Sequence, residues 1–207
     1  QPLGTDQRLW HELFRGAALA RWGETPLGVV VLRDGAAAAR LRGRTHSVGR
    51  DRDAVQHHYD LSDDFYRLFL DPGMVYSCGY FPTGRESLEE AQRAKLELVC
   101  RKLALAPGER LLDVGCGWGA LLEHAASRHG ASGLGITLSE NQLAEARRRL
   151  ARLPGGGGIE VAATDYRTLH PREPFDKVAS VGMMEHVGRA RLHAYFASVH
   201  RLLRPGG

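Results

Sequence analysis

The stretch "RLLDVGCGWG", residues 110–119, decides the fold of this chain. Its first half is apolar and predicts a buried strand, and the glycines that follow predict a tight turn into a helix. A strand, a glycine turn and a helix in this order place backbone amides at the carboxyl edge of a sheet, where adenosine-containing cofactors bind. We therefore expect a cofactor site at this turn, with a purely structural turn as the alternative.

The spacing of the glycines separates two classes of cofactor. It reads Asp113-x-Gly115-x-Gly117-x-Gly119, which differs from the G-x-G-x-x-G of dinucleotide-binding loops. An acidic residue also stands inside the strand, before the first glycine. This combination resembles the first motif of S-adenosylmethionine-dependent methyltransferases, and it disfavours an NAD-dependent oxidoreductase.

Strands and helices alternate along the rest of the chain. The apolar pattern predicts helices over residues 120–130, 140–153 and 189–203, and strands over residues 131–139, 159–163 and 175–184. This alternation is typical of the α/β class and predicts a Rossmann-like doubly wound parallel sheet. Because "LLRPGG" closes the chain after one more helix, we expect the C-terminal strands of such a sheet to be missing from it.

Two helices are predicted before the sheet. The first covers residues 61–70, with Ser62 as its N-cap, and the second runs from Ser87 to about residue 105. Ser87 and Glu90 match a capping box at the start of the second helix, and Pro107-Gly108 ends it.

The first part of the chain has a different character. Residues 9–22 predict an amphipathic helix that lies on a membrane surface, covers a substrate cleft or docks on its own domain. A short strand follows over residues 27–32, and then an arginine-rich segment that is either a solvated linker or a site for phosphates. We therefore divide the chain into an N-terminal segment, residues 1–53, and a methyltransferase domain, residues 54–207.

Composition limits the class of protein. The chain has 207 residues, a mean hydropathy of −0.31 and no apolar run near the ~20 residues of a spanning helix, so we expect a soluble protein. The N-terminus does not resemble a secretory signal, which favours the cytoplasm. Three cysteines without a C-x-x-C pair argue against a disulfide framework and a zinc site, and His57-His58 lacks a second ligand pair, so no metal is expected.

The second predicted strand ends in "GITLSENQ", residues 135–142, without a carboxylate to bind ribose hydroxyls. Thr137 and Gln142 would have to do so. Ser139 and Gln142 also match a capping box, a structural interpretation that is compatible with the first. The helix that follows carries several arginines, which we interpret as a solvated face, with attraction to lipid phosphates as the alternative.

Five motifs together resemble the cyclopropane-fatty-acyl-phospholipid synthase family, which includes the mycolic acid cyclopropane synthases and methyltransferases. The resemblance covers roughly residues 54–207. It rests on "HHYDLSDDFYRLFLDPGMVYSCGYF" (57–81), "LLDVGCGWG" (111–119), "GITLSENQ" (135–142), "DYRTL" (165–169) and "VGMMEHVG" (181–188). The family implies a class I methyltransferase fold with preceding helices that help to cover an acyl chain.

The resemblance also implies the site residues. The residues expected to contact S-adenosylmethionine are Tyr76, Ser77, Asp113, Gly115, Cys116, Gly117, Trp118, Gly119, Thr137, Leu138, Gln142, Tyr166 and Arg167. Cys78 and Glu185 match positions that help to hold a bicarbonate ion. The alternatives are that Cys78 is a buried structural cysteine and that Glu185 caps a helix.

The implied reaction is methyl transfer to the double bond of an unsaturated lipid acyl chain. The resulting carbocation needs aromatic walls, for which Tyr76, Tyr80 and Phe81 are candidates, and a dry pocket. Bound bicarbonate would then remove a proton to give a cyclopropane. Two adjacent anions repel each other, so we expect Glu185 to share a proton with the bicarbonate.

Several alternatives stay open. The acceptor is a lipid or a soluble small molecule, and a non-catalytic cofactor-binding module is a third reading. The product is a cyclopropane, a methyl branch or a hydroxylated chain, because one carbocation leads to all three. Peripheral contact with the inner membrane face and a homodimer are both open, and no nucleic-acid partner is expected.

Overall fold

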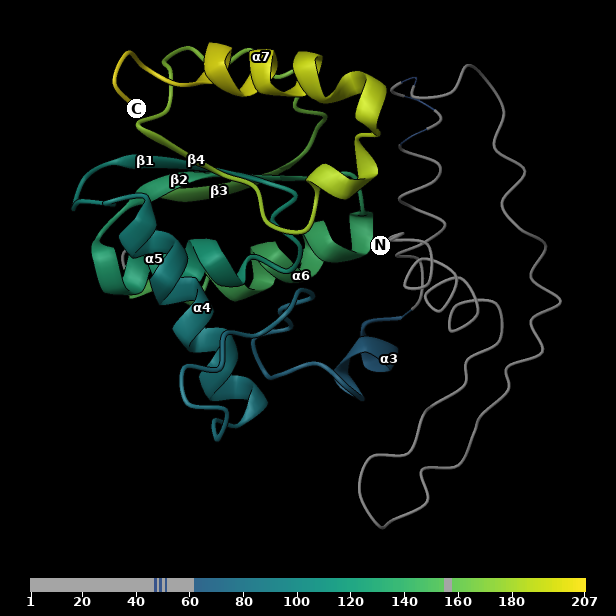
Figure 1. Ribbon diagram of the computed structural model, residues 1–207, viewed down its shortest axis with the longest axis vertical. Helices are drawn as coiled ribbons and strands as arrows, with labels where there is room; N and C mark the ends of the chain where they lie inside the picture. The colour runs from purple at the N-terminus through teal and green to yellow at the C-terminus, as the bar shows by residue number, and fades with distance from the viewer. Residues whose placement is uncertain (1–46, 48, 50, 52–61, 155–157) are drawn as a thin grey trace, which may run out of the picture. The chain divides into compact units, whose positions relative to one another are not determined.

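Figure 1 shows the computed structural model of the chain, which describes residues 47, 49, 51, 62–154 and 158–207. The chain divides into two units, residues 1–40 and 41–207, and the described residues all belong to the second unit. The predicted helix over residues 9–22, the strand over 27–32, the boundary near residue 53 and the pair His57-His58 lie outside the described residues.

A parallel sheet forms the centre of the second unit. Its strands are β1 (Arg110–Val114), β2 (Ser132–Thr137), β3 (Ile159–Ala163) and β4 (Lys177–Ala179), in the order β3-β2-β1-β4. The strand predicted from "RLLDV" is central, with Asp113 beside Gly135 of β2 and Ala179 of β4. The predicted Rossmann-like parallel sheet is confirmed.

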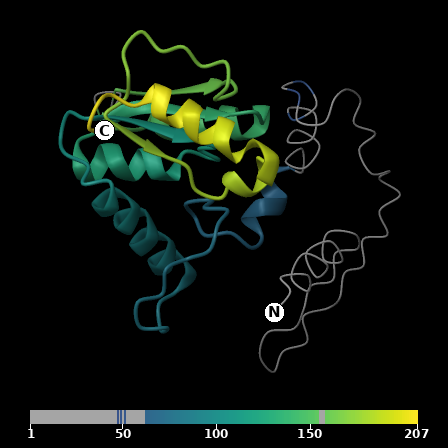
Figure 2. The same ribbon diagram turned by 45° about the horizontal axis from the view of Figure 1, so that its top comes forward.

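Helices cover both faces of this sheet, as Figures 1 and 2 show. The helices α5 (Ala120–His129) and α6 (Glu140–Leu150) pack on one face, and α7 (Leu192–Leu202) packs on the other. Side chains of β1 alternate between the two layers, because Leu111 joins the core under α5 and α6 while Leu112 joins Phe175 and Leu202 under α7. The alternating side chains of β1 therefore contribute to two hydrophobic cores, one on each face of the sheet.

The helices before the sheet are α3 (Asp63–Arg67) and α4 (Leu88–Lys102). Both predicted N-caps are confirmed: Ser62 accepts a hydrogen bond from the Phe65 amide, and Ser87 and Glu90 form the complete capping box. The helix α3 ends at Arg67, earlier than predicted. The Asp71 carboxylate accepts hydrogen bonds from the amides of residues 73 and 75, which holds the chain in a turn instead of a further helical turn.

The segment after the fourth strand differs from its prediction. The apolar run over residues 175–184 predicts a long strand, but β4 covers only Lys177–Ala179. Gly182 then turns the chain with φ +73°, and two short 3-10 helices, η2 (Met184–His186) and η3 (Arg189–Arg191), lead into α7. Apolar residues here line a cavity and do not extend the sheet.

The basic face of α6 is also only partly solvated. Arg147 donates hydrogen bonds to the Val161 carbonyl at 3.1 and 3.2 Å. Arg149 donates to the Gly73 carbonyl at 2.7 Å and pairs with Glu123. These two arginines tie α6 to β3 and to the loop after α3. Arg147 is nevertheless exposed, as the interpretation of a solvated face predicts, whereas Arg149 is partly buried.

Among the described residues, none of the helices combines the length and the apolar character that crossing a membrane requires.

Candidate functional site

A cavity of about 800 Å³ opens at the carboxyl ends of the strands. Its walls come from the glycine loop after β1, the ends of β2 and β3, the segment after β4, part of α4 and the loop around Tyr76. Doubly wound sheets bind ligands at this edge, and the volume is within the range of small-molecule and cofactor sites. All the residues predicted to bind the cofactor line this cavity except Gly119, which is the N-cap of α5.

The glycine loop has the backbone that the sequence predicts. Gly115 and Gly117 have φ values of +81° and +54°, in the left-handed region that favours glycine. The amides of Gly115 and Cys116 both donate to the Ile136 carbonyl at 3.0 Å, which anchors the loop to β2. A side chain at Gly115 would come within 3.1 Å of Met183, so glycine also allows the segment after β4 to approach.

Asp113 is the penultimate residue of β1, and its pKa is strongly shifted. It is 3% exposed, and burial raises its pKa from 3.8 to about 7. Its side chain lines the cavity. A buried carboxyl group at a cavity wall suits a cationic ligand, because an opposite charge would restore the ionised form.

The end of β2 forms a small hydrogen-bonded unit. The Thr137 hydroxyl donates to Oε1 of Gln142 at 2.8 Å, and the Ser139 amide donates to the same hydroxyl. Ser139 caps α6 by accepting from the Gln142 amide, but the Gln142 side chain bonds Thr137, so only half of the predicted capping box forms. The two residues expected at the ribose, Thr137 and Gln142, are therefore held in place at the cavity wall by each other.

The end of β3 contributes an acid that the sequence analysis did not select. Asp165 is 4% exposed, lines the cavity and accepts hydrogen bonds from the side chain and the amide of Arg167. Arg167 also pairs with Asp51 at 2.9 Å. Hydrogen bonding to Asp165 raises the pKa of the guanidinium further above its ordinary value. An acid directly after a predicted strand is the signal that could have identified Asp165.

Aromatic rings join the loop after α3 to the glycine loop. The Trp118 indole donates to Asp63 at 2.8 Å, and its ring lies 4.9 Å from that of Tyr66. Tyr66 in turn contacts Tyr76 edge to face at 5.4 Å. Trp118, predicted to bind the cofactor, lines the cavity and also acts as the link between these two segments.

The segment "YSCGYF" follows the edge of the cavity. Gln92 of α4 donates to the carbonyls of Val75 and Ser77, and Lys95 donates to the Ser77 hydroxyl at 2.6 Å. Lys95 lines the cavity too, and burial lowers its pKa to about 8. The sequence analysis did not select Lys95, because a lysine inside an amphipathic helix has no distinct signal.

The other residues of this segment point elsewhere. Cys78 is exposed, so the interpretation of a buried structural cysteine is wrong. Tyr80 and Phe81 are 45% and 44% exposed and do not line the cavity, whereas Tyr76 does. Of the three rings suggested as walls for a carbocation, the fold brings only Tyr76 to the cavity.

Glu185 lies in η2 and lines a smaller cavity of about 350 Å³, beside Tyr195 and Phe196 of α7. Gly182 separates it from the larger cavity: a side chain at Gly182 would lie 3.8 Å from both Oε1 of Glu185 and Cβ of Ser77. No side chain caps the N-terminus of η2, η3 or α7, so the helix-cap interpretation of Glu185 is wrong.

The fold and the site define a class of protein. A parallel sheet with an acid at the end of its first strand, a glycine loop and a cavity at its carboxyl edge is the arrangement of class I S-adenosylmethionine-dependent methyltransferases. Residues 46–207 match the family described as mycolic acid cyclopropane synthetase. The chain belongs to this family, as the resemblance of its motifs predicts.

Individual relatives agree with this assignment. A "probable fatty acid methyltransferase" of Pseudomonas putida is 44% identical over 79% of this chain and 42% of its own length. "Cyclopropane mycolic acid synthase 1" of Mycobacterium tuberculosis is 44% identical over 74% of this chain and 53% of its own. The chain thus spans about half the length of these relatives.

Solved structures extend the comparison. The crystal structure of mycolic acid cyclopropane synthase CmaA1 complexed with SAH and CTAB superposes with a TM-score of 0.70 at 44% identity, covering 74% of this chain and 53% of the other. Cyclopropane synthase MmaA2 from Mycobacterium tuberculosis superposes with a TM-score of 0.71 at 42% identity and the same coverage.

Proposed function

We propose that this protein binds S-adenosylmethionine in the 800 Å³ cavity and transfers its methyl group to the double bond of an unsaturated lipid acyl chain. The observation that carries the proposal is the cavity itself, whose wall unites the glycine loop, Asp113, the Thr137–Gln142 pair and Asp165. Family membership and the SAH complex of CmaA1 support the same cofactor.

The lining residues fit this cofactor. Asp113 offers a buried carboxyl group to a cationic ligand, and the polar pair Thr137 and Gln142 offers hydrogen bonds to ribose hydroxyls. Asp165 and Tyr166 follow β3 at the same edge of the sheet and can form the wall of the cavity next to the adenine ring of the cofactor. When bound, S-adenosylmethionine supplies an electrophilic methyl group on a sulfonium.

The acceptor proposed is an acyl chain because part of the cavity wall is apolar. The apolar lining residues include Leu96 and Val99 of α4 and Val181, Met183 and Val187 after β4. An isolated alkene is a weak nucleophile, so its reaction needs close approach and exclusion of water, which apolar walls provide. The Tyr76 ring can stabilise the cation that forms on the substrate carbon.

Loss of a proton from the added methyl group then closes a cyclopropane, and we propose bound bicarbonate as the base. The half-buried Lys95 ammonium, bonded to Ser77, gives this edge of the cavity a positive charge that suits an anion. Cys78 follows Ser77, and Glu185 approaches from across Gly182. By the family resemblance, the exposed Cys78 and Glu185 of the smaller cavity would hold the anion together with Lys95, and Glu185 would share its proton.

The lipid substrate implies contact with a membrane surface from the cytoplasmic side. Exposed apolar side chains are available for it around the smaller cavity, namely Met184 and Phe196. We propose peripheral contact there.

Transfer of a radiolabelled methyl group tests the proposal. The complete protein is incubated with methyl-labelled S-adenosylmethionine, bicarbonate and vesicles of a monounsaturated phospholipid. Label should appear in the lipid fraction, and it should not appear with vesicles of the saturated lipid. Cofactor binding without transfer to lipid would favour a soluble acceptor or a binding module, and failure to bind the cofactor would contradict the proposal entirely.

A further inference from the structure

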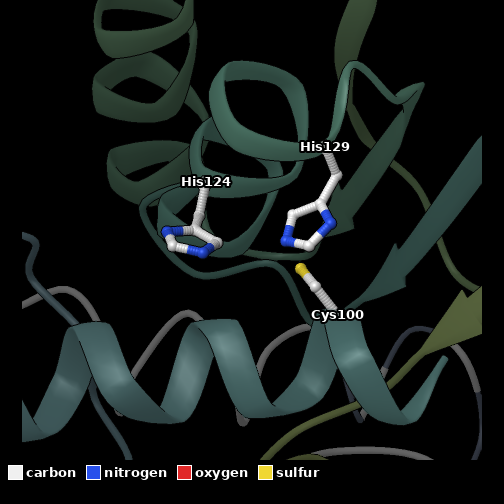
Figure 3. A group of neighbouring side chains, drawn as sticks. All are labelled: Cys100, His124 and His129. Atoms are coloured by element: carbon white, nitrogen blue, oxygen red, sulfur yellow. The ribbon is translucent and has the colours of Figure 1, made fainter. Parts of the chain in front are cut away.

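A second group of reactive side chains lies between α4 and α5. Cys100 projects from α4, and His124 and His129 project from α5, so that the thiol and both imidazoles point toward one another (Figure 3). One ligand atom of each residue lies within 4.8 Å of those of the other two. None of the three residues lines the cavity proposed for the cofactor.

The spacing suits a small tetrahedral cation. Ligand atoms at the corners of a triangle with 4.8 Å edges lie about 2.8 Å from its centre, and zinc bonds to nitrogen and sulfur are about 2.0–2.3 Å long. Each side chain therefore has to move inward by less than about 1 Å to bind zinc. Side-chain rotation alone can provide such a shift.

A fourth donor lies beside the two imidazoles. Oε2 of Glu97 is 3.0 Å from Nε2 of His124 and 3.0 Å from Nε2 of His129. Two ligand atoms around a tetrahedral zinc ion are about 3.3 Å apart, so the carboxylate and the imidazoles already have the separation of metal ligands. Glu97 stands one turn before Cys100 on the same helix.

The burial of the four groups is graded. Cys100 is fully buried, the side chains of His124 and His129 are 11% and 17% exposed, and that of Glu97 is 42% exposed. A cation can therefore enter from the Glu97 side and reach the sulfur. Hydrogen bonds to Glu97 explain why the imidazoles converge, but they give no role to the thiol below them.

We propose that Cys100, His124 and His129, with Glu97 as fourth ligand, form a site for Zn²⁺ that joins α4 to α5. One thiolate and two imidazoles are a donor set typical of zinc. The sequence argued against zinc because it has no C-x-x-C pair, but here the packing of two helices brings together donors that the sequence keeps apart.

Binding of the metal releases one proton and involves no oxidation or reduction. The S–H bond of Cys100 breaks, the proton passes to the solvent, and the sulfur donates its electron pair to the metal with no change of oxidation state. Burial raises the pKa of the Cys100 thiol to about 11, so the metal has to displace a proton that the metal-free protein retains.

Titration of Co²⁺ into the metal-stripped full chain tests the site. A thiolate-to-cobalt charge-transfer band and the visible bands of tetrahedral Co²⁺ should appear with a stoichiometry of one, and Zn²⁺ should abolish them. Zn²⁺ at 100 times its Kd should raise the Tm by roughly 5–10 °C. Absence of the charge-transfer band from the wild-type protein overturns the proposal and leaves a hydrogen-bonded link between the helices.

Variants identify the ligands. Cys100→Ser should lose the charge-transfer band, while Cys78→Ser and His200→Gln, which alter an exposed thiol and an exposed imidazole, should keep it. Because Cys100 is buried and its variant can fail to fold, His124→Gln provides a second test at a partly exposed position. It should weaken Co²⁺ binding at least tenfold with an unchanged circular dichroism spectrum, and unchanged affinity contradicts the assignment.

Discussion

At the scale of single residues, Asp113 connects the fold to the proposed cofactor. Its carboxyl group is buried at the end of the central strand, where it retains a proton up to a pH of about 7. A cationic ligand in the cavity would favour the ionised form. The same residue should therefore reduce the stability of the empty protein near neutral pH and strengthen binding of the cofactor.

The substitution Asp113→Asn separates these two effects. Between pH 3.8 and about 7 the folded wild-type protein holds a proton that the unfolded chain has released, so its free energy of unfolding falls as the pH rises. The free energy of unfolding of the variant should not fall in this way, so above pH 7 the variant should be more stable than the wild-type protein. Its cofactor affinity should be about 10 to 100 times weaker, because a hydrogen bond to a charged group is lost.

Thermal denaturation across this pH range and calorimetric titration of S-adenosylmethionine measure both effects. The wild-type affinity should also rise with pH through about 7. Asp64→Asn, an exposed acid on α3, is the matched control and should change neither quantity. Equal affinities for wild type and Asp113→Asn would remove Asp113 from the binding site.

Lys95 gives a second prediction at this scale, which depends on the proposed bicarbonate. Its pKa of about 8 means that the ammonium loses its charge as the pH rises through that value. In the complete protein the KM for bicarbonate should therefore rise above pH 8, and Lys95→Met should raise it below pH 8 and remove the dependence on pH. Initial rates at varied bicarbonate and pH measure this, and a Lys95→Met variant with the wild-type profile would show that Lys95 does not bind the anion.

At the scale of elements, small residues set how closely helices approach the sheet. Gly135 stands in the middle of β2, where a side chain would come within 2.5 Å of Leu122 in α5 and 2.8 Å of Cys116 in the glycine loop. Because Gly135 has no side chain, both α5 and the glycine loop can pack closely against β2. Nothing in the sequence distinguishes Gly135 from the other glycines of the chain.

Gly135→Ala should consequently destabilise the protein by about 1–3 kcal/mol, the usual cost of overpacking a core. It should also weaken cofactor binding, because Cys116 has to move. Gly49→Ala is the control, since no atom of the described residues lies within 4 Å of the position that its side chain would take. Urea denaturation compares the two, and equal midpoints would contradict the packing described for β2.

The helix α3 is linked to the glycine loop by the Trp118–Asp63 hydrogen bond. Asp63→Ala should cost about 1–3 kcal/mol, since it leaves the buried indole N–H without its partner. Tyr76, which the same aromatic group supports, should become more mobile and the cofactor affinity should fall. The neighbouring Asp64→Ala removes only an exposed ion pair with Arg67 and should have little effect, so equal losses in both variants would argue against this role.

The elements also show what the sequence could predict. Local signals were sufficient for the caps at Ser62 and Ser87, for the strand that contains Asp113 and for the positive φ values of the glycine loop. They failed after β4, because an apolar run predicts a strand equally well when its side chains line a cavity. They also missed Asp165 and Lys95, which only the fold brings to the site.

At the scale of the whole molecule, the described residues form the cofactor half of a family fold. Relatives are about twice as long, and the sheet described here has four strands. The proposed cofactor site lies within these residues, so S-adenosylmethionine binding should be measurable on this chain alone.

The measurement that tests the account most directly uses S-adenosylmethionine with a fully deuterated methyl group. The complete protein is incubated with it, with bicarbonate and with vesicles of a monounsaturated phospholipid, and the acyl chains are analysed by mass spectrometry. A cyclopropane formed by deprotonation of the carbocation retains two of the three deuterium atoms and resists mild hydrogenation. That result is predicted; a product that keeps all three would indicate a methyl branch or a hydroxylated chain, and unaltered lipid beside a cofactor-binding protein would contradict the proposed function.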